Sequence, residues 1–264
     1  MRKERAQKWG SMLNIGEIKS CFQAASLEEL PELIKRYSED ERGGVRKLVE
    51  ASEKKLAALQ REKERIEKLR VYEEKYREYE FICGIDEVGR GPLAGPVVAG
   101  AVILPRDCRI LYINDSKQLS EKKREELFEI IREKAVAFAL GYATPERIDE
   151  INILQATYEA MRQAIDRLKV KPDLLLNDAV TIPKVDIPQV PIIKGDAKSI
   201  TIGAASIVAK VTRDRLMEEY DKVFPEYDFA RNKGYGSPAH IEALKKYGPS
   251  VIHRKSFIKN FIEA

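Results

Sequence analysis

The chain has 264 residues, 44% apolar and 34% charged, enough for one large domain or for a domain with an appendage. Its 47 basic and 43 acidic residues give a net charge of +4, too balanced to indicate a nucleic-acid binder from composition alone. Three cysteines without zinc-binding spacing predict reduced thiols in a cytoplasmic protein, and the longest apolar run, 93–104, is too short to span a membrane. Met1 and Met12 are both candidate translation starts.

Residues 1–80 are rich in Glu, Lys, Arg, Leu and Ala and predict an α-helical N-terminal extension. Ser26 and Glu29 have the spacing of a capping box for a short helix that ends near Tyr37, and DERGG at 40–44 predicts a break after it. A long amphipathic helix follows, with an apolar stripe at Leu56, Leu59, Ile66, Leu69, Tyr72 and Tyr76. The extension is either a solvated arm or a basic arm that holds a polyanion, and its interspersed charges favour the solvated arm slightly.

Residues 81–264 alternate short apolar runs with amphipathic segments, which predicts an α/β domain with a mixed sheet flanked by helices. Five runs predict strands, at 81–86, 96–104, 135–143, 173–178 and 190–196. Helix-start signals at Ser120 and at Thr144 with Pro145, and apolar periodicity over 152–170 and 202–220, predict the helices.

Four acidic residues follow three of the predicted strands: Asp86, Glu87, Asp178 and Asp196. Ligands of open α/β sheets bind outside the carboxyl ends of the strands, so strands that share one direction would bring these side chains to one rim. Antiparallel neighbours would place them at opposite rims. Adjacent strand residues face opposite ways, so Asp86 and Glu87 are expected to share a site only if the backbone leaves strand geometry there. Gly89 and Gly91 favour such a departure.

An acidic set without a nearby thiolate or imidazole favours Mg²⁺ or Mn²⁺ over zinc or copper. Such ions activate an attacking water and stabilise the leaving oxygen in phosphodiester hydrolysis. A solvated charge or a turn role is the commoner explanation for any single acid, and it fits the four together less well. Gly89 and Gly91 allow the backbone to approach a sugar-phosphate chain, and Arg90 can bind a phosphate with two donors. The simpler alternative is a tight turn with an exposed arginine.

Six sequence blocks, in order, closely resemble bacterial ribonuclease HII: ICGIDEVGRGPLAGPVVAGAVILP, NDSKQLS, LLLNDAV, KGDAKSITIGAASIVAKVTRDRLM, KGYGSPAH and HRKSF. The match covers residues 81–257 and implies a ribonuclease-H-like catalytic domain at 81–264. It also implies endonucleolytic cleavage of the RNA strand of RNA/DNA hybrids, and a cut 5′ to a single ribonucleotide in duplex DNA. These activities serve ribonucleotide excision repair and RNA primer removal. A monomer suffices, and no membrane partner is expected.

The resemblance also assigns roles to individual residues. Asp86, Glu87, Asp178 and Asp196 match the family's acidic quartet, which binds Mg²⁺ or Mn²⁺. Gly89, Arg90 and Gly91 match its contact with the ribose 2′-OH and the adjoining phosphate. Tyr235 matches the tyrosine that packs on the deoxyribose at the RNA–DNA junction, whereas a loop tyrosine packed on the domain is the simpler alternative. Lys117, Lys194 and Lys198 are candidate phosphate contacts, with solvated lysines as the alternative.

Three features depart from the resemblance or lie outside it. Asn177 stands where the family usually carries an aliphatic residue, so it needs a hydrogen-bond partner if buried. His240 and His253 show no ligand spacing and are expected to cap or pack. The extension is similar to the longer N-terminal region of some Bacillus-type members but contains no motif that assigns it a role.

Two other functions compete with this one. Ribonuclease HIII would have a β-containing N-terminal platform, against which the helical pattern before residue 80 argues. A catalytically silent nucleic-acid-binding module would leave four strand-end carboxylates without a purpose. The sequence leaves open the preferred metal and the preference for single ribonucleotides over long hybrids.

Overall fold

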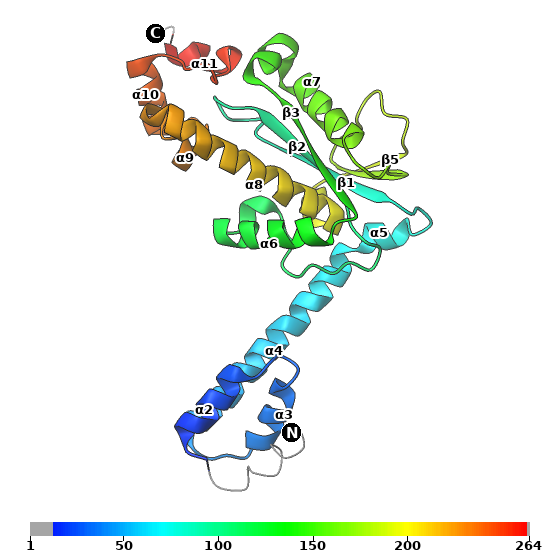
Figure 1. Cartoon of the computed structure of the whole chain (residues 1–264), viewed down its shortest axis with the longest axis vertical. Coiled ribbons are helices and arrows are strands. Elements are labelled where there is room, and N and C mark those ends of the chain that lie inside the picture. The colour runs from blue at the N-terminus through cyan, green and yellow to red at the C-terminus, as the bar shows by residue number, and fades with distance from the viewer. Residues whose placement is uncertain (1–12, 263–264) are drawn as a thin grey trace. The chain divides into compact units, whose positions relative to one another are not determined.

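The computed structural model describes residues 13–262, and the chain divides into two compact units at residues 65 and 66 (Figure 1). The two candidate starts, Met1 and Met12, lie outside the described residues. Among residues 13–262, no helix combines the length and the apolar character needed to cross a membrane.

The first unit is helical, as the sequence predicts. It contains α2 (Ile15–Ala24), α3 (Leu30–Tyr37) and most of α4 (Gly43–Leu69). Its small core consists of Ile18, Phe22, Leu30, Val45 and Val49. The predicted capping box forms, because the Ser26 amide donates to Glu29 Oε2 at 2.8 Å and the Glu29 amide donates to Ser26 Oγ at 3.3 Å. The α-helix itself begins at Leu30, three residues after the start that an N-cap at Ser26 predicts.

The long helix is shorter than its apolar stripe predicts. It ends at Leu69, and α5 (Val71–Lys75) follows after Arg70, whose backbone is not helical. The buried Arg70 guanidinium donates to the Arg106 carbonyl at 2.8 Å and to Glu74 at 2.6 Å, so contacts distant in sequence redirect the chain. Residues 66–75 therefore belong to the second unit.

The second unit is a five-stranded mixed sheet flanked by helices, which confirms the predicted fold class. Its strands, in the spatial order β3-β2-β1-β4-β5, are β1 (Ile82–Val88), β2 (Val97–Ile103), β3 (Ala137–Ala143), β4 (Leu174–Asp178) and β5 (Gln189–Ile192). Strand β2 pairs antiparallel with β1 and β3, whereas β4 is parallel to both β1 and β5.

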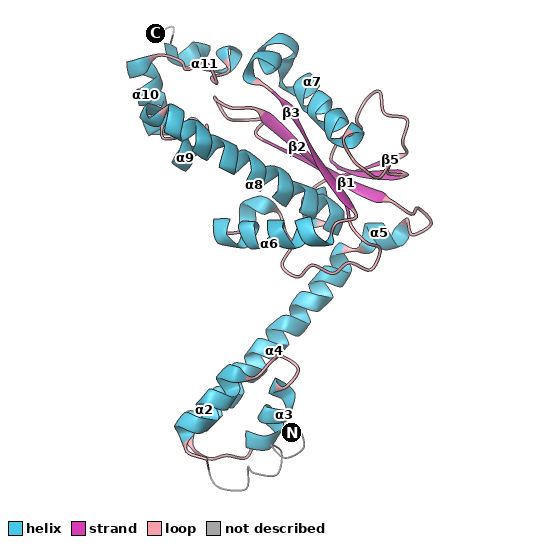
Figure 2. Cartoon of the chain, viewed as in Figure 1, coloured by secondary structure: helices cyan, strands magenta, loops and turns pink. Residues whose placement is uncertain are grey.

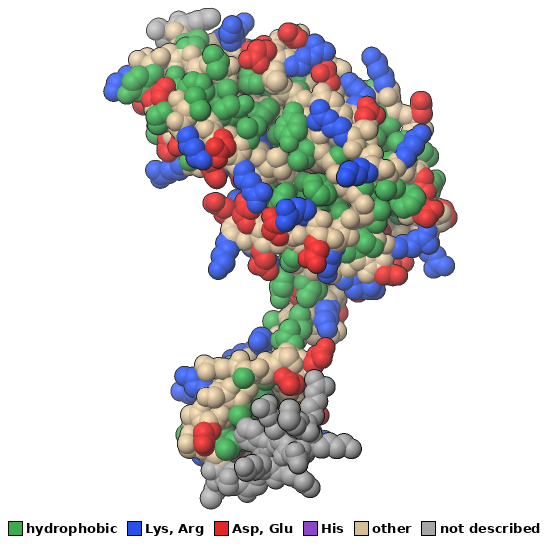
Figure 3. Space-filling view, viewed as in Figure 1, with side chains coloured by type: hydrophobic (Ala, Val, Ile, Leu, Met, Phe, Trp, Pro, Cys, Tyr) green, Lys and Arg blue, Asp and Glu red, His purple; other side chains and the backbone are tan. Residues whose placement is uncertain are grey.

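Helices cover both faces of this sheet (Figure 2). Helix α7 (Pro145–Asp166) packs on one face, and α8 (Ile200–Val223) packs on the other with α6 (Glu121–Lys134) beside it. Short 3₁₀ turns connect the elements: η1 (Ser116–Gln118), η2 (Gly195–Ala197) and η3 (Pro225–Tyr227). On the face seen in Figure 3, Lys and Arg are interspersed with Asp and Glu, in line with the balanced composition.

A glycine lets α8 lie directly against β1. A Cβ at Gly84 would stand 2.1 Å from the Thr201 carbonyl carbon in the first turn of α8. No side chain fits there, so the backbones of β1 and α8 are in direct contact.

The C-terminal helices pack around the loop that follows β1. They are α9 (Phe229–Asn232), α10 (Pro238–Tyr247) and α11 (Lys255–Ile262). Their core contains Tyr227, Phe229 and Leu244 together with Leu93 and Ala94 from that loop. The fold thereby holds the segment after Asp86 and Glu87 between the sheet and the C-terminal region.

Candidate active site

The sheet brings the four predicted acids to one rim. Strands β1, β4 and β5 run in the same direction, so their carboxyl ends lie at one edge of the sheet. Ile85 pairs with Asn177, which places the next residues, Asp86 and Asp178, side by side. Asp196 lies in η2, four residues after the end of β5 at Ile192, so the predicted strand at 190–196 is too long.

The backbone does not leave strand geometry at Glu87, so that expectation is wrong. Pairing with β2 continues through Glu87 opposite Ala99 and Val88 opposite Val98. Asp86 and Glu87 nevertheless both interact electrostatically with Asp178. Asp178 is the last residue of β4, and from this position its negative charge raises the pKa of both Asp86 and Glu87.

Burial and mutual repulsion make these carboxylates costly to ionise. Burial raises the pKa of Asp86 well above its usual value, and the charges of Glu87 and Asp178 raise it further. Burial also raises the pKa of Glu87, with Asp178 adding to the shift and Arg90 opposing it. The pKa of Asp196 is raised by burial, by Asp115 and by Asp178. Asp178 thus acts on all three other acids, which makes the four a single electrostatic cluster.

The cluster suits a hard divalent cation. Its donors are all carboxylate oxygens, and a bound cation would offset both the cost of burial and the repulsion that together raise the pKa values. Within residues 13–262, no three His, Cys, Asp or Glu side chains converge closely enough to hold an ion as they stand. Two carboxylates instead accept backbone amides, since Glu87 N donates to Asp86 Oδ1 at 2.8 Å and Gly195 N to Asp178 Oδ1 at 2.7 Å. Carboxylates have further lone pairs, so these bonds leave them able to bind a cation.

The GRG loop, residues 89–91, is held from inside by Arg254. This arginine is fully buried, and it donates to the carbonyls of Gly89 at 2.5 Å, Arg90 at 2.9 Å and Gly95 at 2.8 Å. In a trans peptide the N–H points opposite to the carbonyl, so the amides of Arg90 and Gly91 point away from Arg254. Adjacent amides of this kind form an anion-binding concavity. The Arg90 side chain is exposed and approaches Glu87 Oε1 at 3.4 Å.

A second buried arginine supports the neighbouring backbone. Arg213 donates to the carbonyls of Ala94, Pro96 and Lys233. Burial lowers the pKa of Arg254 to about 9 and that of Arg213 to about 10, values at which both remain charged at neutral pH. Sequence reasoning missed both residues, although Arg254 lies in the block HRKSF and Arg213 in the block KGDAKSITIGAASIVAKVTRDRLM. Arginine is mostly a surface residue. The backbone carbonyls that accept hydrogen bonds from these two buried side chains come mainly from distant segments of the sequence.

Tyr235 lies opposite the GRG loop. Its Cε1 is 3.8 Å from the position that a Cβ at Gly91 would occupy, and its side chain is 44% exposed. Its carbonyl accepts a hydrogen bond from His240 Nδ1 at 2.8 Å, and His240 and His253 are joined through their Nε2 atoms at 2.9 Å. Both histidines are buried, as expected for a packing role.

The three predicted lysines differ in their surroundings. Lys117 lies in η1, and its positive charge lowers the pKa of both Glu87 and Asp196. The fold therefore brings it to the acidic cluster. Lys194 and Lys198 flank η2 and are exposed. Neither is among the main causes of the pKa shifts of the acidic cluster.

Asn177 has the partner that its burial requires. It is fully buried, and its Nδ2 donates to Gln189 Oε1 at 2.8 Å. Its Oδ1 has no partner among the described residues. The amide pair therefore joins β4 to β5 next to Asp178.

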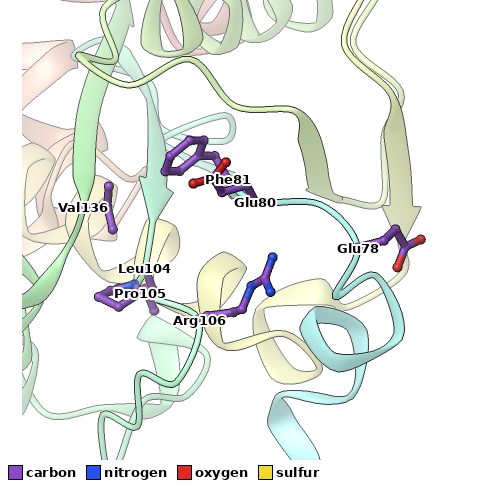
Figure 4. Close-up of a pocket in the computed structure, with 7 residues that line it drawn as sticks. All are labelled: Glu78, Glu80, Phe81, Leu104, Pro105, Arg106 and Val136. Atoms are coloured by element: carbon purple, nitrogen blue, oxygen red, sulfur yellow. The ribbon is translucent and has the colours of Figure 1, made fainter.

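A pocket of about 510 Å³ lies at the other end of β1 and is distinct from the acidic cluster (Figure 4). It is lined by Glu78, Glu80, Phe81, Leu104, Pro105, Arg106 and Val136. Phe81 precedes β1, whereas Asp86 and Glu87 lie near its carboxyl end.

Comparison with known proteins agrees with the motifs. The family model for Ribonuclease HII matches residues 83–260, and the one for the Ribonuclease HII N-terminal domain matches residues 14–77. The Ribonuclease HII of Lachnoclostridium phytofermentans is 69% identical over 225 residues, which are 85% of this chain and 89% of that protein. The Ribonuclease HII of Clostridioides difficile is 52% identical over 94% of this chain and 98% of its own length.

A solved structure shares the fold. The ribonuclease H2 from Pyrococcus horikoshii OT3 superposes with a TM-score of 0.60 at 30% identity, covering 69% of this chain and 97% of that one. The sheet, the motifs and these relatives agree, and one family model alone spans more than half of the sequence. The chain therefore belongs to the ribonuclease HII family and is a ribonuclease H type 2 enzyme.

Proposed function

We propose that this enzyme hydrolyses the RNA strand of RNA/DNA hybrids and cuts 5′ to single ribonucleotides in duplex DNA, leaving a 5′-phosphate. The observation that supports this most is the shared rim of the sheet, where Asp86 and Asp178 stand side by side at the ends of two parallel strands and Asp196 follows the third. An acidic cluster beside two outward-facing amides suits a phosphodiester, whose phosphate is anionic and whose hydrolysis needs an activated water.

Asp86, Glu87, Asp178 and Asp196 would hold Mg²⁺ or Mn²⁺, which when bound supplies an activated water and stabilises the leaving oxygen. The chain's own part is to fix the carboxylates before substrate arrives. Asp86 and Asp178 are held by the backbone amides of Glu87 and Gly195, and burial keeps bulk water away from Asp86.

The GRG loop would select the ribonucleotide. The amides of Arg90 and Gly91, directed outward by Arg254, are suited to a phosphate oxygen or a 2′-hydroxyl oxygen. Tyr235 offers an exposed ring across from Gly91, where a sugar can pack. Lys117 would bind a phosphate near the acids, with Lys194 and Lys198 as outer contacts.

The proposal extends to the setting of the reaction. We assign the enzyme to ribonucleotide excision repair and RNA primer removal, as a cytoplasmic monomer. Residues 81–264 would form the catalytic domain and residues 1–80 its helical extension.

The test is cleavage of a labelled DNA duplex that contains one internal ribonucleotide, with Mg²⁺, with Mn²⁺ and with EDTA. An all-DNA duplex and a long RNA/DNA hybrid serve as controls. We expect one metal-dependent cut 5′ to the ribonucleotide, an intact all-DNA duplex, and no cleavage by Asp178→Asn.

Other outcomes would change the assignment in defined ways. Cleavage of the long hybrid alone would retain the metal chemistry and remove the specificity for single ribonucleotides. An Asp178→Asn protein as fast as wild type would overturn the quartet, and no cleavage under any condition would favour a binding module.

A further inference from the structure

Glu73 connects the segment before the catalytic sheet to the start of α8. One oxygen of its carboxylate, Oε1, accepts three hydrogen bonds, from Ser199 Oγ at 2.5 Å, Thr201 Oγ1 at 2.8 Å and Thr201 N at 3.1 Å. Ser199 is fully buried and Thr201 is 2% exposed, so water does not replace Glu73 as their acceptor. The contact spans more than 120 residues of sequence and lies within the second unit.

These bonds complete the N-terminus of a helix. The first amides of a helix have no acceptor within it, and a negative charge there is stabilised by the helix dipole. Thr201 N finds its acceptor in Glu73, and Ile202 N finds one in Ser199 Oγ, the N-cap side chain. Because the Ser199 hydroxyl donates its proton to Glu73, its lone pairs are free to cap Ile202.

The first turn of α8 contacts both segments that supply acids. Ser199 N donates to the Gly195 carbonyl at 2.8 Å, and a Cβ at Gly203 would stand 3.1 Å from the Asp196 carbonyl oxygen. On its other side this turn lies against β1, since Gly84, two residues before Asp86, touches the Thr201 backbone. The turn that Glu73 caps therefore sets the position of Asp196 relative to Asp86.

We propose that Glu73 is a positioning residue of the active site, acting through the first turn of α8 to fix the segment that carries Asp196. Glu73 lies within residues 14–77, the part of the chain that matches the family's N-terminal model. The N-terminal region would thus contribute a residue to the order of the catalytic centre. The expected effect on metal binding rests on the metal-dependent nuclease proposed above, whereas the ordering of residues 195–203 does not.

The test compares Glu73→Ala, Glu73→Gln and Glu78→Ala in the full chain. Gln keeps an oxygen acceptor for the three donors, loses the charge, and places an amide NH2 where the buried Oε2 has no hydrogen-bond partner among the described residues. Glu78 is an exposed acid five residues further along the same segment, so its removal is a matched control for charge. The measurements are amide hydrogen exchange of residues 195–203 without metal, calorimetric binding of Mn²⁺ without nucleic acid, and KM and kcat as Mg²⁺ is varied.

We expect Glu73→Ala to speed exchange at Ser199 and Gly203 and to weaken Mn²⁺ binding by about 10-fold or more, the usual loss when a residue that orients metal ligands is removed. The Mg²⁺ concentration for half-maximal kcat should rise while KM for the nucleic acid stays constant. Glu73→Gln should restore part of the affinity, and Glu78→Ala should match wild type.

Equal exchange and equal Mn²⁺ affinity in Glu73→Ala and wild type would overturn the proposal, and so would equal losses in all three variants, which would show a general charge effect. If Glu73→Ala does not fold, Thr201→Val decides the question, because it removes one donor and keeps the shape. Faster exchange in Thr201→Val supports the proposal, and wild-type exchange overturns it. A wild-type protein that cleaves nothing would overturn the proposed function, while metal-free exchange would still decide the role of Glu73.

Discussion

Gly89 and Gly91 flank the same arginine, yet the fold requires only one of them to be glycine. Gly89 has φ of +90°, and a Cβ there would stand 2.2 Å from Arg213 Nε. Gly91 has no positive φ, and its nearest contact would be Tyr235 at 3.8 Å. The fold therefore has room for a methyl group at Gly91, in contact with Tyr235, whereas Gly89 must be glycine for the fold.

The two glycines make a matched pair of variants. Gly91→Ala should leave the thermal midpoint close to wild type and slow cleavage at a single ribonucleotide by about 10-fold or more, because a methyl group misplaces the sugar. Gly89→Ala should destabilise the protein by about 2 kcal/mol or more, through positive φ and the clash with Arg213. Thermal unfolding and single-turnover cleavage distinguish them. Wild-type cleavage by Gly91→Ala would remove Gly91 from the substrate site.

The buried Arg254 should control selectivity as well as stability. Arg254→Lys keeps the charge but loses the planar fork that spans the carbonyls of Gly89, Arg90 and Gly95. We expect the ratio of Kd values for all-DNA and ribonucleotide-containing duplexes to fall towards one, because the outward amides lose their fixed direction. A ratio is measured because a general loss of folded protein affects both duplexes equally.

The partly buried Arg147 provides the control, since its guanidinium pairs with Glu150 and Glu159 and not with the carbonyls of the GRG loop. Arg147→Lys should keep the wild-type ratio. A wild-type ratio in Arg254→Lys would show that the loop holds its amides without this guanidinium.

At the scale of elements, His240 and His253 join α10 to the segment before α11. Ser250 N can only donate, so His253 Nδ1 accepts from it, and His253 Nε2 must carry the proton that is donated to His240. His240 Nδ1 then donates to the Tyr235 carbonyl. Both rings are neutral in this arrangement, and burial together with the neighbouring His240 lowers the pKa of His253 to about 4.

This pair predicts a loss of stability in mild acid. The unfolded histidine titrates near 6.5, so between pH 6.5 and about 4 the unfolded chain binds more protons than the folded one. The contribution is complete above pH 6.5 and falls as the pH decreases, by about 2 kcal/mol from pH 7 to pH 5. Urea unfolding at both pH values measures the change.

His253→Gln isolates this effect from other titrating groups. Gln can accept from Ser250 and donate to His240 but does not titrate, so its stability should fall less between pH 7 and pH 5. Parallel losses in variant and wild type would assign the acid sensitivity to other groups.

Local sequence patterns predicted helices and strands well where the apolar residues follow a single helical or strand periodicity. The apolar runs predicted all five strands, because burial follows from short-range sequence. The shared direction of β1, β4 and β5, on which the rim depends, was left open by the sequence and comes from the pairing of the strands. The stripe through Tyr72 and Tyr76 predicted a helix that continues past Leu69, and there it was wrong. Arg70 turns the chain through the Arg106 carbonyl, a contact 36 residues away that no local period contains.

At the scale of the whole molecule, the boundary between the compact units differs from the change in composition. Composition changes near residue 80, whereas the compact units divide between residues 65 and 66. Ile66 and Leu69 lie in the core beneath α8, and Glu73 caps that helix. A catalytic fragment that begins after this segment would lose both contacts.

Two truncations should therefore behave differently. Residues 66–264 should fold cooperatively and cleave at a rate close to that of the full chain. Residues 76–264 should have a lower unfolding midpoint, because the core loses Ile66 and Leu69, at about 1.5–3 kcal/mol for each side chain, and the first turn of α8 loses the acidic acceptor of the Thr201 amide. Thermal unfolding followed by circular dichroism compares them. Equal midpoints would show that residues 66–75 contribute nothing to the catalytic unit.

The longer fragment, 66–264, also tests whether the first unit binds nucleic acid. Acids and bases alternate along α4, with Arg65 paired to Glu62, so the helix presents no continuous basic stripe. Binding to a polyanion releases counter-ions in proportion to the phosphates contacted, so each lost contact reduces the slope of log K against log salt by about 0.9. We expect the same slope for residues 66–264 and the full chain, measured by fluorescence anisotropy in EDTA to prevent cleavage. A shallower slope and weaker binding in the fragment would instead identify the first unit as an arm that grips the duplex.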